Sequence, residues 1–206
     1  MVRQLERRAA TVEAILRAAR ELFAEAGFEA TSIDDIATRA GVAKGAVYHH
    51  FRSKEAVFVA VLEAVQAGLA VDLARRAARA RRGPLEQMIE AIRSYLVAAS
   101  GAEARRILLI DGPVVIGWMK WREIDERYFG AGVRHMLATL AGLDAASPEI
   151  EPLARVIMGG VMEAALACAS AANTTRRAAA YAAAFRPLLA GLARSSGRPE
   201  GGANAS

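Results

Sequence analysis

The sequence predicts an all-helical protein of about nine helices, and three features of its patterning lead to that prediction. Apolar residues recur three, four and seven positions apart along most of the chain, which is the spacing of one helical face. Glycine and proline residues interrupt this pattern at intervals typical of helix ends. No segment shows the sustained apolar/polar alternation of a half-buried strand, so we expect no sheet.

The first two helices have clear ends. The first spans residues 11–26, and Gly27 ends it as a C-terminal cap because glycine adopts the left-handed conformation without strain. The second runs from about residue 31 to residue 40, with Thr31 or Ser32 as its N-cap.

A glycine turn and a short third helix follow. Gly41 supplies the turn, and the third helix spans residues 43–51. Ala37 lies four residues before Gly41, and a small side chain there lets the two helices pack closely. This order is the spacing of a helix-turn-helix.

The later helices follow from the same pattern. Ser53 caps a long fourth helix that reaches about residue 82, and Pro84 suits the first turn of the fifth. We predict the remaining helices at residues 84–99, 102–111, 113–141, 149–172 and 174–195. The tail, residues 196–206, is predicted to be disordered.

Composition indicates a soluble cytoplasmic protein. The 206 residues suffice for a substantial core, and Cys168 is the only cysteine, which excludes an internal disulfide. The first residues lack the apolar segment of a signal peptide, and the apolar runs at residues 107–110 and 114–119 are too short to span a membrane. We therefore expect neither export nor membrane insertion.

Net charge does not by itself point to nucleic acid. The formal net charge is +5, but residues 1–60 contain nine lysines or arginines against eight acidic residues, a balance of about +1. A nucleic-acid partner must therefore be argued from the motif.

The third helix carries that argument. After the turn, Val42 and Val47 are expected to contact the core. The outward face of the helix is left with the side chains of Ala43, Lys44, Gly45, Tyr48 and His49. Small residues at the start of this face allow close approach to base edges in a major groove, and the others offer hydrogen-bond donors and aromatic surface.

The same region resembles the tetracycline-repressor (TetR) family. Residues 31–37 (TSIDDIA), 41–51 (GVAKGAVYHHF) and 53–55 (SKE) look like the signature of that family, and the resemblance covers about residues 11–62. It implies an all-helical homodimer with a DNA-binding domain at residues 1–52, a ligand-binding and dimerisation domain at residues 53–195, and no cofactor.

The resemblance also implies roles for single residues. Lys44, Gly45 and His49 would face bases or adjacent phosphates of a double-stranded operator. Three further residues would contact the DNA backbone: Tyr48, His50 and Lys54. Thr31 and Ser32 would assist them from the second helix. His50 departs from the general motif, where an apolar residue is common, and we expect Phe51 to fill the core instead.

Each of these residues also has a simpler role. Tyr48 and Phe51 are candidates for core aromatics, and Lys44 and Lys54 for ordinary solvated lysines. Adjacent histidines on a helix point in different directions, which disfavours a metal site at His49. Arg3, Arg7 and Arg8 form either a phosphate-tracking arm or a frayed terminus.

Beyond residue 80 the resemblance gives no residue-level guidance. Aromatic and thioether side chains dominate pockets for apolar ligands. The candidate ligand contacts are therefore Tyr95, Trp118, Trp121, Phe129, Met158 and Met162, and the alternative is a packed core. Asp111 is expected to cap the helix that begins at Pro113 rather than to orient a ligand. Cys168 is expected to be a small buried residue rather than a thiol sensor.

The last two helices are expected to form a four-helix dimer interface. Small residues, including Gly159, Gly160 and residues 164–172, allow close helix contact across a two-fold axis. The functions weighed are a ligand-responsive repressor, a regulator or activator without small-molecule input, and an enzyme. An enzyme is disfavoured because no phosphate-binding glycine loop or metal-spaced residue set occurs, and His135 has no evident nucleophile partner.

Overall fold

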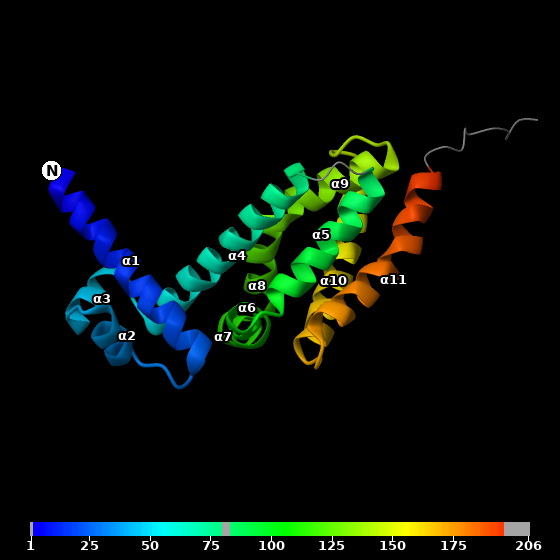
Figure 1. Cartoon of the computed structure of the whole chain (residues 1–206). Helices are drawn as coiled ribbons and strands as arrows, with labels where there is room; N and C mark the ends of the chain where they lie inside the picture. The colour runs from blue at the N-terminus through cyan, green and yellow to red at the C-terminus, as the bar shows by residue number, and fades with distance from the viewer. Residues whose placement is uncertain (1, 80–82, 196–206) are drawn as a thin grey trace, which may run out of the picture. The chain divides into compact units, whose positions relative to one another are not determined.

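A computed structural model of the chain describes residues 2–79 and 83–195 (Figure 1). Within these ranges every regular element is a helix, so the predicted all-helical fold is confirmed. The disordered tail predicted at residues 196–206 lies outside the described residues. The chain divides into two compact units, which are described separately.

Unit 1 contains the described residues up to Gly68 together with Gly101–Ile124. Its helices are α1 (Val2–Glu25), α2 (Ile33–Ala40), α3 (Lys44–His50), the first part of α4 (Lys54–Arg79), α6 (Ala102–Ala104), the π-helix η1 (Arg105–Asp111), α7 (Gly112–Ile116) and most of α8 (Trp118–Asp125). Helix α1 packs against α2, α6 and η1. Residues 101–124 therefore share a core with the predicted DNA-binding segment, although they are distant in sequence.

Three phenylalanine rings lie at the centre of unit 1. Phe23 and Phe58 are fully buried, and their ring centroids lie 5.2 Å apart in an edge-to-face arrangement. Phe28 packs against both rings, at 5.9 Å and 5.2 Å. Such contacts add about 0.5–1.5 kcal/mol per pair to the burial of the rings. The cluster joins α1, the loop after it and α4.

Helix α1 begins earlier than predicted. It starts at Val2 rather than near residue 11, so Arg7 and Arg8 lie on a helix, with both side chains exposed. This segment is therefore helical, and phosphate contact by its arginines stays a prediction. The apolar periodicity begins only at Val12, because the first turns of α1 bury little.

The prediction of one continuous helix over residues 113–141 is wrong, because the helix is interrupted at Gly117. Gly117 has a φ of +79°, which ends α7 and starts α8 in a new direction. The helical path then continues through η2 (Glu126–Gly130) into α9 (Ala131–Ala141). A positive φ at a glycine leaves no trace in apolar periodicity, so the sequence pattern missed this break.

The N-terminus of α2 has a complete capping box. The Ser32 hydroxyl accepts from the Asp35 amide at 3.1 Å, and the Asp35 carboxylate accepts from the Ser32 amide at 2.9 Å. Ser32 is therefore the N-cap, one of the two predicted candidates. Gly41 ends the same helix with a φ of +68°.

We expect Ser32→Ala to lower the free energy of unfolding by about 1 kcal/mol, because α2 loses its N-cap. The hydrogen bonds from Ser32 hold the pKa of Asp35 below its ordinary value of 3.8. Asp35 therefore contributes stability above that value and loses it as the pH falls through the lower folded-state pKa. Denaturant titrations at several pH values should show the difference between the variant and the wild type narrowing in acid. An undiminished difference at the acid end would contradict this account.

Unit 2 contains Leu69–Ser100 and the described residues from Asp125 onward. Its helices are the end of α4, α5 (Pro84–Ala99), η2, α9, α10 (Ile150–Ala169) and α11 (Thr174–Ser195). Helix α5 packs against α11, α10 and α9, and α10 also packs against α9 and α11. The core of unit 2 is therefore shared by four α-helices, α5, α9, α10 and α11.

Helix α10 uses some of its small residues inside the chain. A Cβ on Gly160 would lie 3.2 Å from the Phe185 ring of α11, and Ala164 and Ala165 are buried. Gly159, by contrast, is exposed and faces open space. Only part of the predicted small-residue set is thus available to a second subunit.

Two helices are long and apolar enough to cross a membrane by composition alone, Lys54–Ala77 and Ile150–Ala169. Core helices of water-soluble proteins meet the same criterion. Both helices supply fully buried side chains to the two cores, for example Phe58 and Leu62 in α4 and Cys168 in α10.

Candidate functional site

Helices α2 and α3 form a rigid helix-turn-helix scaffold. Ile36 and Val47 are fully buried and Ala37 is nearly so, which brings the two helices together as predicted. The Val42 amide donates to the Ala37 carbonyl at 3.0 Å across the turn at Gly41. The backbone direction of α3 is therefore fixed by both packing and hydrogen bonding.

The outward face of α3 is open. Ala43, Lys44, Gly45 and His49 are exposed, and Tyr48 keeps 51% of its surface accessible. A Cβ on Gly45 would meet no atom within 4 Å, so packing inside the protein does not require a glycine there. Because Gly45 has no side chain, another molecule can approach the α3 backbone closely at this point, as base edges in a major groove would.

Lys44 is held by an acidic neighbour. Its Nζ donates to Asp34 Oδ2 at 2.8 Å, and this hydrogen bond, together with the negative charge of Asp34, raises the pKa of Lys44 above its ordinary value. Both side chains are more than half exposed. The ammonium group is thus charged and pre-positioned, and a phosphate would have to compete with Asp34 for it.

The two histidines differ in their surroundings. Their rings meet edge to face with centroids 5.1 Å apart, and His50 is half-buried whereas His49 is exposed. Burial, with smaller contributions from the charges of His49 and Arg8, lowers the pKa of His50 below 6.5. These surroundings therefore favour the neutral form of His50 in the free protein. Phe51, expected in the core, is only half-buried.

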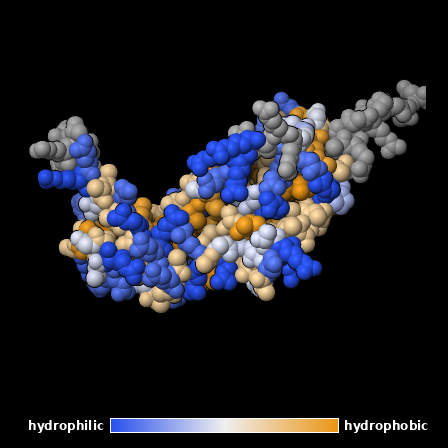
Figure 2. Space-filling model, in the orientation of Figure 1, coloured by the Kyte–Doolittle hydropathy of each residue, from blue (hydrophilic) through white to orange (hydrophobic). Residues whose placement is uncertain are grey.

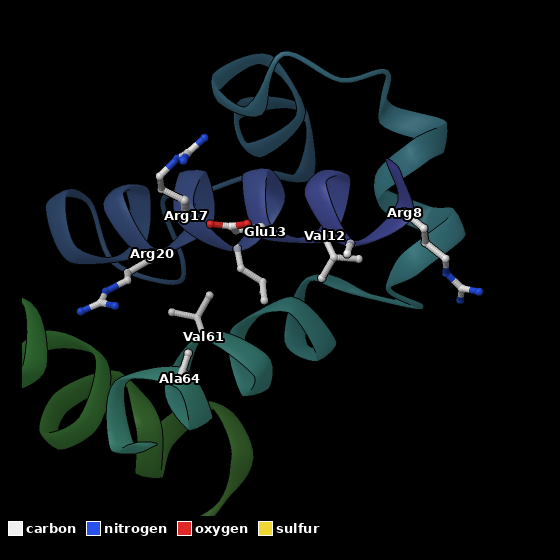
Figure 3. Close-up of a pocket in the computed structure, with 9 residues that line it drawn as sticks. Arg8, Val12, Glu13, Arg17, Arg20, Val61 and Ala64 are labelled. Carbon is white, nitrogen blue, oxygen red and sulfur yellow. The ribbon is translucent and has the colours of Figure 1, made fainter. Parts of the chain in front are cut away.

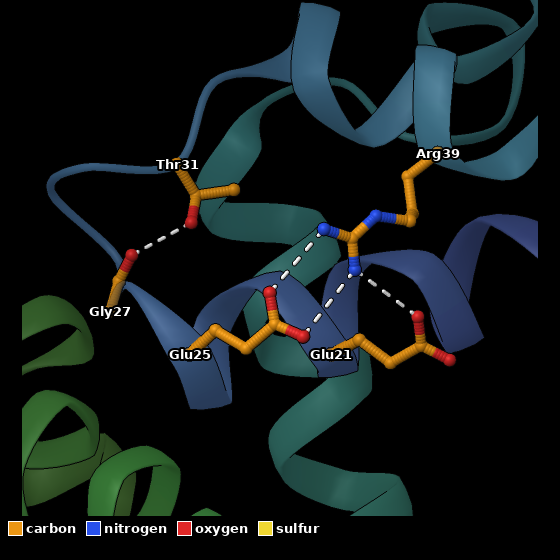
Figure 4. A network of polar contacts seen from close by, with 5 residues as sticks. All are labelled: Glu21, Glu25, Gly27, Thr31 and Arg39. Atoms are coloured by element: carbon orange, nitrogen blue, oxygen red, sulfur yellow. Dashed lines mark hydrogen bonds and ion pairs between the residues drawn. The ribbon is translucent and has the colours of Figure 1, made fainter.

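Thr31 does not present its side chain as expected for a DNA contact. It is only 2% exposed, and its hydroxyl donates to the Gly27 carbonyl at 2.8 Å (Figure 4). The neighbouring Ser32 is exposed, with its hydroxyl in the capping box. Thr31 therefore shapes the loop before α2, because its polar group is satisfied within the protein.

Arg39 ties α2 to α1 on the same side of unit 1. Its guanidinium lies 3.4 Å from Glu21 and 3.3 Å from Glu25, as Figure 4 shows. All three side chains are substantially exposed, so each pair contributes little on its own.

Lys54 is anchored to the loop after α1 rather than projecting freely. Its Nζ donates to the Phe28 carbonyl at 2.7 Å and lies 4.1 Å from the centroid of the Phe28 ring. No sequence pattern indicates this partner, which is 26 residues away. The predicted cap of α4 is confirmed beside it, since the Ser53 hydroxyl accepts from the Ala56 amide at 3.1 Å.

Asp111 holds the other side of Phe28. Its Oδ2 accepts from the Phe28 amide at 2.8 Å and from Arg106 Nε at 3.2 Å, and Arg106 Nη2 reaches the Ala26 carbonyl at 3.4 Å. The predicted helix cap is wrong, because the Asp111 side chain makes no capping hydrogen bond and its backbone is already helical. The carboxylate instead fixes the loop that leads into α2.

We expect Asp111→Ala to lower the free energy of unfolding by about 1–2 kcal/mol, since the part-buried Phe28 amide loses its acceptor. Hydrogen exchange at the Phe28 amide should become faster. Asp111→Asn retains an acceptor oxygen and serves as the matched variant with a smaller loss. Equal effects of the two substitutions would contradict the assigned hydrogen bond.

An open groove lies between α1 and α4 within unit 1. It has a volume of about 760 Å³, an apolar floor that includes Val12 and Val61, and arginines at its rim (Figure 3). In Figure 3 the side chains of Arg8 and Arg20 point away from the floor, and Arg20 pairs with Glu103 at 2.5 Å. The groove gives no indication of a specific occupant.

Unit 2 contains a separate cavity of about 330 Å³. Four of the six predicted ligand contacts line it together: Tyr95, Phe129, Met158 and Met162. The Tyr95 and Phe129 rings meet edge to face with centroids 5.4 Å apart. Asp125, Tyr128 and His135 also line it and were not predicted. Their recurrence along one face of the helical path from the end of α8 to α9 was a usable signal.

The two tryptophans are not in this cavity. Both belong to unit 1, where their rings stack with centroids 5.4 Å apart. Trp121 is fully buried and donates from Nε1 to the Leu108 carbonyl at 2.9 Å, whereas Trp118 is 51% exposed. Trp121 therefore belongs to a packed core, which was the alternative to a ligand contact.

Residues with redox or metal-binding chemistry are few. Cys168 is fully buried as expected, and burial raises the pKa of its thiol. Among the described residues no group of three histidine, cysteine or acidic side chains is arranged to hold a metal ion.

The surface of unit 2 retains exposed apolar side chains on its last two helices. Val156 is 72% exposed, Leu166 41% and Leu188 63%. Hydrophobic and hydrophilic patches alternate on the face of the molecule drawn in Figure 2. Exposed apolar residues on α10 and α11 are available for contact with another surface.

Two family models match the chain. The model described as bacterial regulatory proteins of the tetR family matches residues 15–61, and the model of the tetracyclin repressor-like C-terminal domain matches residues 85–192. The second match alone covers more than half of the 206 residues.

Individual relatives agree with these matches. The HTH-type transcriptional regulator UidR of Escherichia coli strain K12 is 38% identical over 96 residues, which are 44% of this chain and 45% of UidR. The chain spans less than half the length of the curated relatives it matches.

Solved structures share the fold. A TetR-family regulator from Pectobacterium atrosepticum has a TM-score of 0.69 and 29% identity, covering 91% of this chain and 96% of its own. RolR in complex with resorcinol has a TM-score of 0.69 at 19% identity, covering 95% of this chain and 97% of its own, which shows the fold alone.

Proposed function

The chain belongs to the TetR family of DNA-binding transcriptional regulators, and on that premise we propose that it is a repressor that a small molecule releases from a palindromic operator. Members of this family are regulators and not enzymes. In our proposal the protein acts in the cytoplasm, where its operator DNA is accessible.

The outward face of α3 is the observation that carries this proposal. Lys44, Gly45, Tyr48 and His49 are exposed on a helix whose buried side and N-terminal turn are fixed by packing. In our proposal these side chains read base edges and phosphates in the major groove, and Ser32 assists from α2. Lys54 contributes to phosphate contact only if it leaves the Phe28 carbonyl.

A second subunit is part of the proposal. Two recognition helices must lie roughly 34–36 Å apart to enter successive major grooves of a palindrome. The exposed apolar residues on α10 and α11, Val156, Leu166 and Leu188, are the proposed contact between subunits. Isologous burial of these side chains would form a four-helix interface.

The release step is assigned to the cavity of unit 2. Helix α4 belongs to unit 1 through Gly68 and to unit 2 from Leu69, and Ala70 and Leu73 in its second part line the cavity. In our proposal the ligand binds more tightly when α4 is in a position that does not suit DNA binding. Ligand binding then shifts the equilibrium away from the DNA-bound state. An activator, or a regulator without ligand, would use the same α3 face.

DNA binding and release should be measured separately. Fluorescence anisotropy of the purified protein with DNA from its own upstream region should give saturable binding, lost when the palindrome is scrambled. Light scattering should give a dimer in solution. Specific binding that no ligand of the cavity weakens would overturn release, and the absence of any specific site would overturn the proposal as a whole.

A further inference from the structure

The cavity of unit 2 has an uneven chemical lining. It is formed within that unit by α4, α5, η2, α9, α10 and the end of α8. Most of its wall is apolar, and four methionines contribute to it. The methionines are Met88, Met136, Met158 and Met162. Such a wall adapts to the shape of an apolar ligand.

The lining contains few ionisable side chains. Asp125 is the only carboxylate among the described lining residues, and these include no lysine or arginine. Asp125 is only 4% exposed, so it lies in the interior, whereas His135 is exposed. The remaining polar groups are the hydroxyls of Tyr95 and Tyr128.

This lining disfavours a negatively charged ligand. A buried anion needs a nearby cation or several donors to offset its lost hydration. The described lining residues include no lysine or arginine that could provide this cation. A carboxylate has about four lone-pair sites and accepts further hydrogen bonds beside those it already makes. A ligand N–H or O–H group near Asp125 is therefore favoured.

The aromatic residues strengthen the same preference. Tyr95 and Phe129 meet edge to face, and the faces of such rings attract cations and stack with flat apolar groups. The volume of about 330 Å³ is near the lower end of the range of about 300–1,000 Å³ that is usual for ligand pockets. The ligand that fits is thus compact.

We propose that this cavity takes a compact, mainly apolar ligand that carries an N–H or O–H donor and no negative charge, and that Asp125 accepts its hydrogen bond. The inference rests on the proposed ligand-binding function and specifies its chemistry. Both neutral alcohols or phenols and protonated amines satisfy it. Carboxylates and phosphates do not.

Three probes with one ring system test this proposal: 2-naphthol, 2-naphthylmethylamine and 2-naphthoate. Calorimetric titration of the full-length protein at neutral pH should show the naphthoate binding at least about tenfold more weakly than the better of the other two, which corresponds to about 1.4 kcal/mol. Naphthoate binding that is equal or tighter would overturn the proposal. Failure of both the naphthol and the amine to bind would overturn it as well.

Asp125→Asn tests the assigned residue with little change in shape. In this variant the naphthoate should bind no more than about threefold more weakly than the better of the other two probes. The affinity for the amine should fall more than the affinity for the naphthol. The matched control is Asp72→Asn, an exposed carboxylate on α4 that pairs with Arg75 at 3.3 Å and does not line the cavity. This control should keep the wild-type preference. An unchanged preference in Asp125→Asn would overturn the role of Asp125.

Gly132→Leu tests the location independently of Asp125. Gly132 lines the cavity, and a Cβ there would meet no atom within 4 Å, so the substitution begins without a clash; thermal unfolding of the variant checks that it is folded. The added side chain should weaken both preferred probes by at least about tenfold. Unchanged affinities would place the binding elsewhere and overturn the proposal.

These measurements are made without DNA, so they separate the ligand chemistry from the regulatory function. If the preferred probes bind selectively but leave the operator complex intact, only the proposed ligand-induced release is contradicted. Release of the operator by an anion that occupies the cavity would contradict the proposed chemistry alone.

Discussion

Replacing both Lys44 and Tyr48 with alanine should weaken operator binding by roughly one to two orders of magnitude, since a lost base or phosphate contact costs about 1–3 kcal/mol and contacts on one helix are not fully additive. Both side chains are exposed on α3, and neither contributes to the core of unit 1. The variant should therefore unfold at nearly the wild-type temperature. Fluorescence anisotropy with the palindrome, together with thermal unfolding, gives both values.

The control for this experiment is Arg75→Ala. Arg75 is also an exposed basic residue with an acidic partner, Asp72, but it lies in unit 2. Its loss should leave the operator affinity unchanged, and both variants should remain dimers in light scattering. An unaffected affinity in the Lys44/Tyr48 variant, or dissociation of its dimer, would show that α3 does not have the role assigned to it.

Trp121→Ala should lower the free energy of unfolding by about 3–5 kcal/mol, the usual cost of removing a large buried aromatic side chain. Trp121 is fully buried, and a Cβ on Gly112 would come within 2.8 Å of its ring, so the indole fills its site tightly. The Leu108 carbonyl also loses the indole N–H donor. Chemical denaturation followed by circular dichroism measures the change.

The neighbouring tryptophan provides the contrast. Trp118 stacks on Trp121 but is half exposed, so Trp118→Ala should cost much less. Trp121→Phe should fall between these two, because the ring is partly replaced and the hydrogen bond is lost. Equal losses for the two alanine variants would contradict the assignment of Trp121 to the core.

The DNA-binding segment was predictable because its determinants are local. The N-cap at Ser32, the left-handed glycine at Gly41 and the small residue Ala37 each act within one helix or turn. Once these are fixed, helical periodicity alone decides that Val47 faces inward and Tyr48 outward.

Partners distant in sequence were not predictable in the same way. Lys54 and Asp111 look like a free lysine and a helix cap, yet both hold the backbone of Phe28 from segments 26 and 83 residues away. A polar side chain with several possible partners takes the one that the packing of other helices brings close. Thr31 was misassigned for the same reason, because its burial depends on the helices around the loop.

The sequence by itself determined the helical composition, the helix-turn-helix and the side chains exposed on α3, since each depends on residues only a few positions apart. The tertiary structure decided which aromatic residues form a cavity and which fill a core. It placed Tyr95 and Phe129 together in unit 2, and Trp118 and Trp121 in unit 1. An aromatic side chain has the same apolar surface in either place, so only the packing of non-neighbouring helices distinguishes a space left open from one that is filled.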